Sequence, residues 1–325
     1  MPANIRWGIV GCGDVCEVKS GPAFYKCARS SLAAVMRRDA AKAKDFALRH
    51  GAARYYSNAD DLINDTEVDI VYVATPPESH AELAIKALKA CKPVYVEKPM
   101  AISYQECLRM LDAAKAYQQK LFVAYYRRSL PYFLKIKELI DIGAIGKPQV
   151  VQAGFFRPPL FSDKDKSLHT WRINKEIAGG GYFYDMASHT IDILMFLLGK
   201  ITKANGVTGN VAGWYEAEDV VSASFLFESG AVGSAVWLYA SSETEQKDWI
   251  KITGDKGSIR FSTFAFSSIE LSTEVGISTF ACPKPEHIQQ AMVQSIVDEL
   301  LGSGICPSTG ETGALTSRVM EEIYK

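Results

Sequence analysis

The sequence predicts an α/β protein: first a doubly wound parallel sheet, then an α+β domain with a large, mainly antiparallel sheet. Over residues 1–124, short β-rich runs alternate with helical stretches, and the runs are apolar. Apolar strands without alternation are typical of parallel sheets that helices cover on both faces. Residues 201–280 instead hold β-branched and aromatic runs separated by turns. A chain of 325 residues is long enough for two domains, which we place at residues 1–124 and 125–325.

The first domain is expected to contain strands joined by helices. Strands are predicted at residues 5–10, 32–37, 53–56, 68–74, 94–97 and 121–124. Helical composition covers residues 39–50, 78–90 and 103–119. Ser103 is the expected N-cap of the last helix, with Glu106 in the capping-box position.

The second domain has a different order of predicted helices and strands. Helices are predicted at residues 131–142 and 182–198, and two more near the C-terminus at 285–301 and 311–324. Residues 148–156 form a β-rich run, a polar loop covers 157–166, and three glycines precede the helix at 182. Strands and helices in separate runs favour an antiparallel sheet packed against helices.

Charge and cysteine content narrow the function classes. Lys and Arg number 36 against 37 Asp and Glu, a net charge of −1, so nucleic acid and membrane surfaces are not expected partners. The sequence holds no apolar stretch of spanning length and no secretory signal, and we expect a cytoplasmic protein. Seven cysteines, an odd number, indicate reduced thiols. Cys12 and Cys16 lack a second ligand pair, so no metal site is expected.

The segment GCGDVC at residues 11–16 follows the first predicted strand. Glycines are needed there when a tight turn brings the backbone against a pyrophosphate, which then rests on the N-terminus of the next helix. The motif alone is weak, but its place in an alternating strand–helix pattern favours a dinucleotide site. The residues expected to contact the dinucleotide are Gly11, Cys12, Gly13, Asp14 and Val15.

The residues after the second strand bear on the choice of cofactor. An acidic residue there would bind ribose hydroxyls, whereas Arg37 and Arg38 suit a 2′-phosphate. The pair favours NADP over NAD; two solvated surface arginines are the alternative.

Two further segments are expected at the carboxyl edge of the sheet. Thr75, Pro76 and Pro77 follow the fourth strand, and His80 comes next as either a helix cap or a neighbour of the cofactor. Glu97-Lys98-Pro99 ends the fifth strand. A partly desolvated lysine there could act as acid or base, although lysines at strand ends are usually only solvent-exposed.

A polar stripe marks the otherwise apolar helix at 182–198. Asp185, His189 and Asp192 are spaced i, i+4 and i+7 and are expected on one face. Such a stripe either lines a cleft or is a buried histidine satisfied by two carboxylates.

Together these motifs resemble the glucose-fructose oxidoreductase, inositol dehydrogenase and MocA (Gfo/Idh/MocA) family over essentially the whole chain. The segments that carry the resemblance are Gly11-Cys12-Gly13, Ala74-Thr75-Pro76, Glu97-Lys98-Pro99, Tyr126-Arg127-Arg128 with Pro131, Trp171-Arg172 and residues 179–199. The resemblance implies a Rossmann domain followed by a substrate-binding and oligomerisation domain.

The resemblance also implies residue roles. Lys98 matches the family's catalytic lysine, and Asp185 and His189 match its Asp-x-x-x-His pair. Glu97, Tyr126, Trp171 and Arg172 match positions that contact the dinucleotide. Tyr126 departs from the Asn of many relatives, and Arg37 from the acid of NAD-preferring ones.

We therefore expect an NADP(H)-dependent enzyme, with NAD as the alternative, that passes a hydride between nicotinamide and a sugar, sugar derivative or cyclic polyol. A neutral base must take the hydroxyl proton; His189, oriented by Asp185, or Lys98 could do so. The alternatives are a cofactor-retaining glycosidase or epimerase and a non-catalytic dinucleotide-binding regulator. The family also implies a homodimer or homotetramer.

Overall fold

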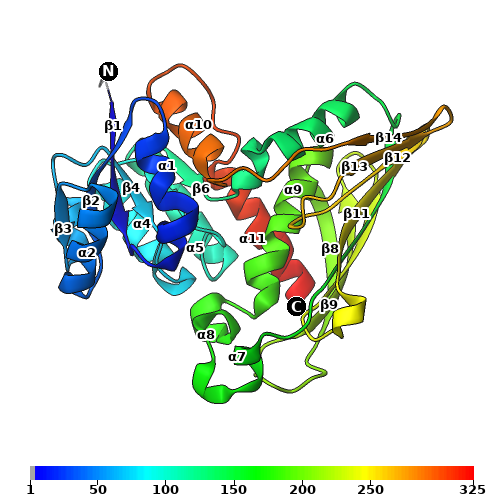
Figure 1. Ribbon diagram of the computed structural model, residues 1–325, viewed down its shortest axis with the longest axis horizontal. Coiled ribbons are helices and arrows are strands. Elements are labelled where there is room, and N and C mark those ends of the chain that lie inside the picture. Colours follow the sequence, from blue (N-terminus) through cyan, green and yellow to red (C-terminus); the bar gives the residue numbers. More distant parts are fainter. Residues whose placement is uncertain (1–3) are drawn as a thin grey trace. The chain divides into compact units, whose positions relative to one another are not determined.

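Six parallel strands form the first sheet, in the order β3-β2-β1-β4-β5-β6 (Figure 1). The computed structural model describes residues 4–325. The strands are β1 (Ile5–Val10), β2 (Ser30–Met36), β3 (Arg54–Tyr56), β4 (Ile70–Val73), β5 (Val94–Val96) and β6 (Leu121–Val123). This is the strand order of a doubly wound dinucleotide-binding sheet. The first strands are added on one side of β1 and the later ones on its other side, so the switch point lies between β1 and β4. The predicted Rossmann fold is confirmed.

Helices cover both faces of this sheet. The elements between and after the strands are η1 (Cys16–Ser20), α1 (Gly21–Lys26), α2 (Ala40–His50), α3 (Ala59–Ile63), η2 (Pro77–Ser79), α4 (His80–Lys89), α5 (Tyr104–Ala116), η3 (Tyr126–Ser129) and α10 (Gln290–Leu300). Ser103 caps α5 as expected, because its hydroxyl accepts the Glu106 N–H at 3.2 Å. The helix expected after the glycine turn, for which no range was predicted, runs from Asp14 to Lys26 and includes a π-helical turn.

The two faces of the parallel sheet have different cores. Valines of β4 and β5 join one apolar cluster with residues of α3, α4 and α5. On the other face the rings of Trp7, Phe24, Tyr72 and Tyr95 stack in series, with centroids 4.6 to 5.1 Å apart along Trp7–Phe24–Tyr72–Tyr95. Side chains alternate between faces along a strand, so Tyr72 and Tyr95 point away from the valines beside them.

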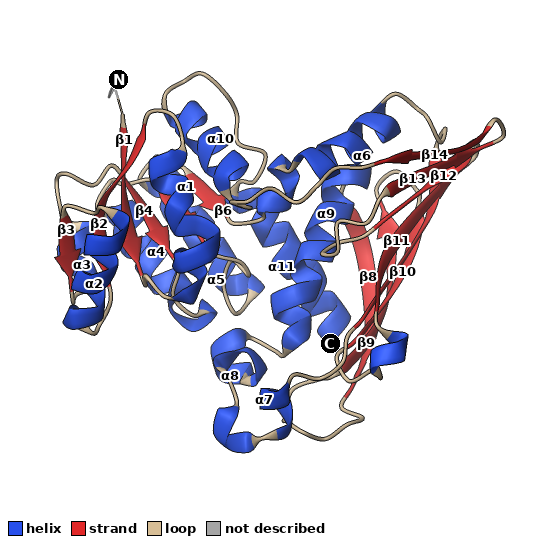
Figure 2. Ribbon diagram, viewed as in Figure 1, coloured by secondary structure: helices blue, strands red, loops and turns tan. Residues whose placement is uncertain are grey.

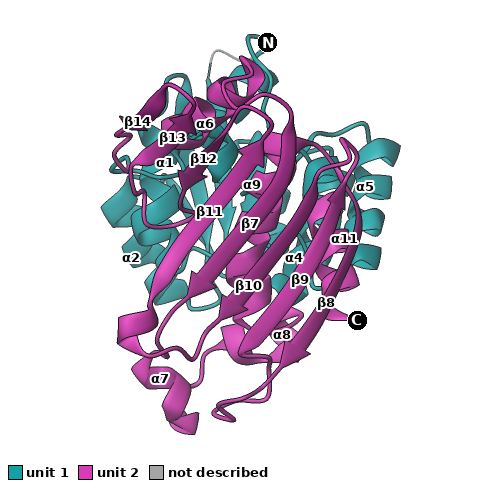
Figure 3. Ribbon diagram, turned by 90° about the vertical axis from the view of Figure 1, so that its right-hand side faces the viewer, with its two compact units in different colours: residues 1–130, 285–314 teal, residues 131–284, 315–325 magenta. Residues whose placement is uncertain are grey.

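Eight strands form the second sheet, in the order β14-β13-β12-β11-β7-β10-β9-β8 (Figure 3). The strands are β7 (Pro148–Phe156), β8 (Ile201–Gly209), β9 (Val220–Phe227), β10 (Val232–Leu238), β11 (Lys247–Gly254), β12 (Gly257–Phe261), β13 (Ile269–Thr273) and β14 (Gly276–Phe280). Within residues 4–325, neighbouring pairs are antiparallel except β7 with β10. Buried and exposed residues alternate along β9 and β10, so one face is covered. The predicted mainly antiparallel sheet is confirmed.

Residues 131–284 and 315–325 also form helices. They are α6 (Pro131–Asp141), α7 (Phe161–Lys164), η4 (Lys166–Leu168), η5 (Trp171–Ile173), α8 (Lys175–Ala178), η6 (Phe183–Ala187), α9 (Ser188–Leu198), η7 (Glu243–Glu245) and the last turns of α11 (Gly310–Tyr324) (Figure 2). The helix predicted at 182–198 therefore begins with a π-helical turn, η6, before it becomes α-helical.

The chain divides into units that are not continuous in sequence. Unit 1 comprises residues 1–130 and 285–314, and unit 2 comprises 131–284 and 315–325. The sequence division at residue 125 therefore differs from the structure chiefly in residues 285–314. This segment joins unit 1 because Ser308 accepts the Val123 N–H and donates its hydroxyl to Val123 O, at 3.3 and 2.7 Å, extending the edge of β6.

Candidate active site

The turn after β1 has the geometry of a nucleotide-binding loop. Gly11 has a φ of +90°, and a Cβ there would lie 2.7 Å from Thr75 Cγ2. A Cβ on Gly13 would meet only Gly11 O, at 3.9 Å, so open space lies beside this residue. Gly11 is thus required by backbone conformation and by β4, whereas Gly13 leaves room for a group to approach the backbone.

The helix after this turn begins at Asp14. In dinucleotide-binding sheets the N-terminus of the helix after the glycine turn is where a pyrophosphate binds. Cys12 and Cys16 are buried beneath the turn, and burial raises the pKa of Cys12 to about 11. The Cys12 thiol therefore stays protonated at neutral pH and packs as a small apolar group.

Replacement of Gly11 by alanine is expected to weaken dinucleotide binding by 10-fold or more. A positive φ costs a non-glycine residue about 1–2 kcal/mol, and the added methyl group would clash with Thr75. Dinucleotide affinity measured by fluorescence titration checks this prediction. Gly51→Ala is the control, since Gly51 also has a positive φ but nothing within 4 Å of its Cβ position. Equal affinities of the two variants would contradict the assignment of the turn.

Arg37 and Arg38 follow β2, where the adenosine end of a dinucleotide is expected. Arg37 is half-buried and donates from Nη1 to Cys12 O at 3.4 Å, while Arg38 is exposed. The next residue, Asp39, caps α2: its Oδ1 accepts the Ala41 and Lys42 N–H groups at 3.1 and 3.2 Å. These bonds, the one from Lys42 first, lower the pKa of Asp39. The carboxylate of this segment is thus committed to the helix N-terminus.

Thr75, Pro76, Pro77 and His80 form the segment after β4. Ser79 donates its hydroxyl to Thr75 Oγ1 at 2.7 Å, which closes the turn. The His80 ring is buried, with Nε2 2.7 Å from Thr75 O and Nδ1 3.0 Å from Pro99 O. Burial lowers the pKa of His80, while the two carbonyl contacts act in the opposite direction. His80 therefore ties the loop after β4 to the loop after β5.

Glu97 and Lys98 follow β5 at the same sheet edge. The Glu97 carboxylate is buried and accepts the hydroxyl of Tyr72 at 2.6 Å and the amide of Gln289 at 2.8 Å on Oε1. Its Oε2 accepts the backbone N–H of Lys98 at 3.2 Å. Lys98 itself is partly exposed.

Tyr126 begins the short helix η3 after β6. It is buried, and the Arg127 guanidinium lies over its ring at 5.1 Å. Unit 1 thus holds the predicted dinucleotide residues of the turn, of Arg37 and Arg38, of the Thr75 and Glu97 segments and of Tyr126, all after the carboxyl ends of its strands.

Trp171, Arg172, Asp185 and His189 lie in unit 2. Arg172 Nε contacts Asp185 Oδ2 at 3.3 Å, and its guanidinium lies 4.6 Å from the Trp171 ring centroid. Trp171, the arginine and the carboxylate therefore form one row of contacts, from η5 to η6. In this ion pair the positive charge of Arg172 offsets the negative charge of Asp185.

His189 lies at the start of α9. Its ring is buried and meets Phe264 edge-to-face at 5.9 Å between centroids. Asp192, one turn later, accepts the hydroxyl of Thr316 at 3.3 Å. The two carboxylates of the stripe therefore have different surroundings. Asp185 pairs with Arg172, whereas Asp192 is buried and hydrogen-bonded. The π-helical turn that contains Asp185 changes its direction relative to a regular α-helix.

Family comparison adds to this geometry. Residues 5–125 match the family model described as an oxidoreductase family with an NAD-binding Rossmann fold, GFO/IDH/MocA, and residues 133–260 match the GFO/IDH/MocA C-terminal domain. The chain is also 40% identical over 321 residues to oxidoreductase P35 of Formosa agariphila, covering 99% of this chain and 98% of that one. The chain belongs to the GFO/IDH/MocA oxidoreductase family. It is an enzyme of the dehydrogenase and reductase class with an NAD-binding Rossmann domain.

Two more members of this family are similar to the chain. The levoglucosan dehydrogenase of Pseudarthrobacter phenanthrenivorans is 30% identical over 242 residues, which is 67% of this chain and 62% of that protein. The solved structure of an aldose-aldose oxidoreductase from Caulobacter crescentus, complexed with glycerol, has a TM-score of 0.87 at 25% identity and covers 99% of this chain and 96% of that one.

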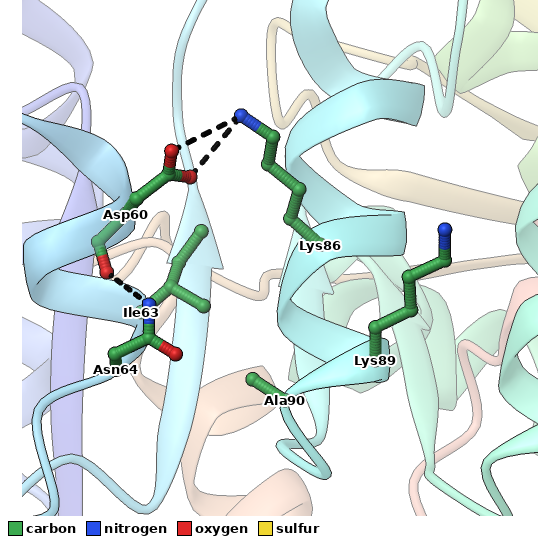
Figure 4. A pocket seen from close by; sticks show the side chains of 6 residues that line it. All are labelled: Asp60, Ile63, Asn64, Lys86, Lys89 and Ala90. Atoms are coloured by element: carbon green, nitrogen blue, oxygen red, sulfur yellow. Dashed lines mark hydrogen bonds and ion pairs between the residues drawn. The ribbon is translucent and has the colours of Figure 1, made fainter.

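A surface pocket of about 290 Å³ lies elsewhere on this oxidoreductase, between α3 and α4 (Figure 4). Lys86 crosses it to pair with Asp60 at 3.1 Å. Its lining ends at Ala90, after the C-terminus of α4, whereas His80 at the helix start lies at the carboxyl edge of the sheet. The pocket is therefore at the opposite edge from the nucleotide turn.

Searches of the described residues 4–325 add two findings. No group of three or more His, Cys, Asp or Glu residues there is arranged to hold a metal ion. Within the same range, no helix has both the length and the apolar character that crossing a membrane requires.

The sequence prediction missed two polar groups that support the site. In unit 1, Tyr72, Tyr95 and Gln289 surround Glu97; two tyrosines in register within otherwise aliphatic strands were the available signal. In unit 2, buried Asp163 accepts the Tyr182 hydroxyl at 2.5 Å and contacts Arg157 at 3.5 Å. This group anchors the loop after β7 to the residues that precede η6.

Proposed function

We propose that this oxidoreductase passes a hydride between NADP(H) and a carbinol or carbonyl carbon of a sugar, sugar derivative or cyclic polyol. The observation that carries the proposal is the shared edge of unit 1, where the nucleotide turn at Gly11 and Lys98 both follow carboxyl ends of parallel strands. Open space at Gly13 fits a pyrophosphate against the backbone. When bound, the dinucleotide supplies or accepts the hydride.

NADP preference is supported by the ends of β2 and α2. Arg37 and Arg38 supply two positive charges there, and the one carboxylate of this segment, Asp39, accepts two backbone N–H groups of its own helix. Arginine binds phosphate through paired, charge-assisted hydrogen bonds, so a 2′-phosphate fits this segment better than bare ribose hydroxyls.

Replacing both arginines by alanine is expected to weaken NADP binding by about 10- to 100-fold and to change NAD binding by less than threefold. Charge-assisted hydrogen bonds contribute about 1.5–3 kcal/mol each at most, which sets this range. Isothermal titration with both dinucleotides measures it, with Lys44→Ala as a control because Lys44 is an exposed cation of α2. Equal losses for NADP and NAD would overturn the preference.

The proposed catalytic group consists of Lys98, Asp185 and His189. Oxidation of an alcohol requires removal of its hydroxyl proton, which a neutral amine or imidazole accepts. The ammonium form of Lys98 stabilises the developing alkoxide. The Asp185 carboxylate is paired with the Arg172 guanidinium, so their charges offset each other. This part of the site therefore suits an uncharged sugar hydroxyl.

Relatives named for sugar substrates support the proposed substrate class. A panel of aldoses, anhydrosugars and polyols, assayed with NADP and NAD at 340 nm, tests it. Steady production of reduced cofactor is the expected result. Turnover without net cofactor reduction would favour the cofactor-retaining alternative, and dinucleotide binding without any turnover would favour a regulator.

We also propose that subunits pair through the open face of the second sheet. Val150, Val207 and Val232 are exposed on strands β7, β8 and β10, and exposed apolar groups on a sheet favour association. Light scattering is expected to give a dimer or tetramer mass; a monomer at micromolar concentration would contradict it.

A further inference from the structure

A buried hydrogen-bond network includes Glu97, the residue directly before Lys98. The hydroxyl of Tyr95 donates to Gln289 Oε1 at 2.9 Å, and Gln289 Nε2 donates to Glu97 Oε1 at 2.8 Å. Tyr72 donates to the same carboxylate oxygen at 2.6 Å. Tyr72, Tyr95 and Gln289 are fully buried, and Glu97 is 7% exposed.

The carboxylate at the centre of this network accepts hydrogen bonds from three neutral groups of the described residues 4–325. A hydroxyl, a side-chain amide and the Lys98 N–H, which reaches Oε2 at 3.2 Å, satisfy its oxygens without cancelling its charge. Burying a charged carboxylate costs free energy, and hydrogen bonds from neutral groups offset only part of that cost. An apolar side chain at this position would not carry it. Stability alone therefore does not explain why a carboxylate occupies this position.

Glu97 contacts the main chain at Lys98, and His80 contacts the main chain of the next residue, Pro99. Glu97 Oε2 holds the Lys98 N–H, while His80 Nδ1 lies 3.0 Å from Pro99 O. The main chain that carries the lysine is thus fixed before and after it.

We propose that Gln289 is a positioning residue of the hydride-transfer reaction: it orients the Glu97 carboxylate, which in turn fixes the main chain that carries the Lys98 side chain. This proposal rests on the proposed function. Gln289 is well suited to the task because both ends of its amide are engaged, which fixes its orientation. It precedes α10, whose segment is tied to unit 1 where Cys27 Sγ donates to Gln290 O at 3.3 Å.

Two replacements of Gln289 separate positioning from packing. Gln289→Leu keeps the volume and removes both bonds; kcat is expected to fall about 10- to 100-fold, with KM and dinucleotide affinity changed less than threefold. Gln289→Glu places a second carboxyl group beside Glu97, and such pairs share one proton. While that proton is held, its O–H donates as the amide does, so kcat is near normal at low pH and falls as pH rises.

A second readout does not depend on activity. Reductive methylation with ¹³C-formaldehyde followed by NMR titration reports the pKa of individual lysines, and the Lys98 signal is assigned from its loss in Lys98→Arg. In Gln289→Glu the shared proton is expected to have left by the pH at which lysines titrate, and the negative charge then added is expected to raise the Lys98 midpoint by about one pH unit. Gln294→Leu is the control, because Gln294 also makes amide hydrogen bonds from α10 but to Ala28 and Asp298.

The outcomes decide between the proposals. A Lys98 midpoint within about 0.2 pH units of the natural protein in Gln289→Glu, with kcat within twofold in both variants, overturns the role of Gln289. Absence of turnover in the natural protein on every sugar tested is a failure of the proposed function, and the Lys98 titration still tests the coupling. If Gln289→Leu does not fold, Tyr95→Phe takes its place: it removes one hydroxyl, and an unchanged kcat there also overturns the proposal.

Discussion

Replacement of Lys98 by methionine is expected to lower kcat for sugar oxidation by about 1,000-fold while dinucleotide affinity changes less than fivefold. Methionine keeps the length of the side chain and removes its charge and its proton. Acid–base groups and donors to a developing oxyanion each contribute about 10²- to 10³-fold or more, and Lys98 is proposed to serve in one or both ways. Steady-state rates at 340 nm and fluorescence titration with reduced dinucleotide measure the two quantities.

Lys89→Met is the matched control for Lys98. Lys89 is an exposed lysine of the same unit, at the end of α4, and its replacement is expected to leave kcat within twofold. Full activity of Lys98→Met, with the control equally active, would remove Lys98 from the chemistry.

Replacement of His189 by asparagine is expected to lower kcat/KM for oxidation by about 100- to 1,000-fold. In the natural enzyme, oxidation should slow as pH falls through the range where imidazoles titrate, because a protonated base cannot accept the hydroxyl proton. The variant should lose that acidic limb. pH profiles of kcat/KM from pH 5 to 9 measure it.

The same profiles decide between the two candidate bases. If the acidic limb disappears in His189→Asn and persists in a residual rate of Lys98→Met, His189 is the base. His169→Asn is the control, because His169 is a histidine of the same unit whose Nε2 lies 3.2 Å from the Asp163 main-chain oxygen. Retention of rate and limb in His189→Asn would contradict a role for His189 in proton transfer.

Local patterns were enough to predict the two sheets. Apart from β3, the strands of unit 1 are short, mainly apolar runs, and the structure places all six within about two residues of the prediction. The one glycine that mattered most, Gly11, was found because a tight turn after an apolar strand needs a positive φ.

Long-range contacts account for what the sequence did not reveal. Residues 285–314 were assigned to the second domain because chain order gives no sign that Ser308 pairs with Val123 at the edge of β6. The residues just before η6 are held by a distant segment: a Cβ on Gly181 would lie 2.9 Å from Glu218 Oε1, which accepts the Gly181 N–H. Periodicity alone does not encode such contacts.

The supporting residues of the site were missed for the same reason. Gln289 lies 192 positions after Glu97, so their hydrogen bond has no local signature. Arg172 was expected to contact the dinucleotide, and that role stays a prediction; its ion pair with Asp185 was not anticipated. By contrast, Asp39 could have been recognised as a helix cap, since it directly precedes the α2 helix.

The central claim is that a hydride passes between a sugar carbon and the nicotinamide. Incubation of the enzyme with NADP and a sugar substrate deuterated at the reacting carbon, followed by mass spectrometry of the dinucleotide, tests this claim most directly. The account predicts reduced dinucleotide that is one mass unit heavier than that formed from the unlabelled sugar. Turnover of the sugar with no deuterium in the dinucleotide, either free or bound to the protein, would contradict it.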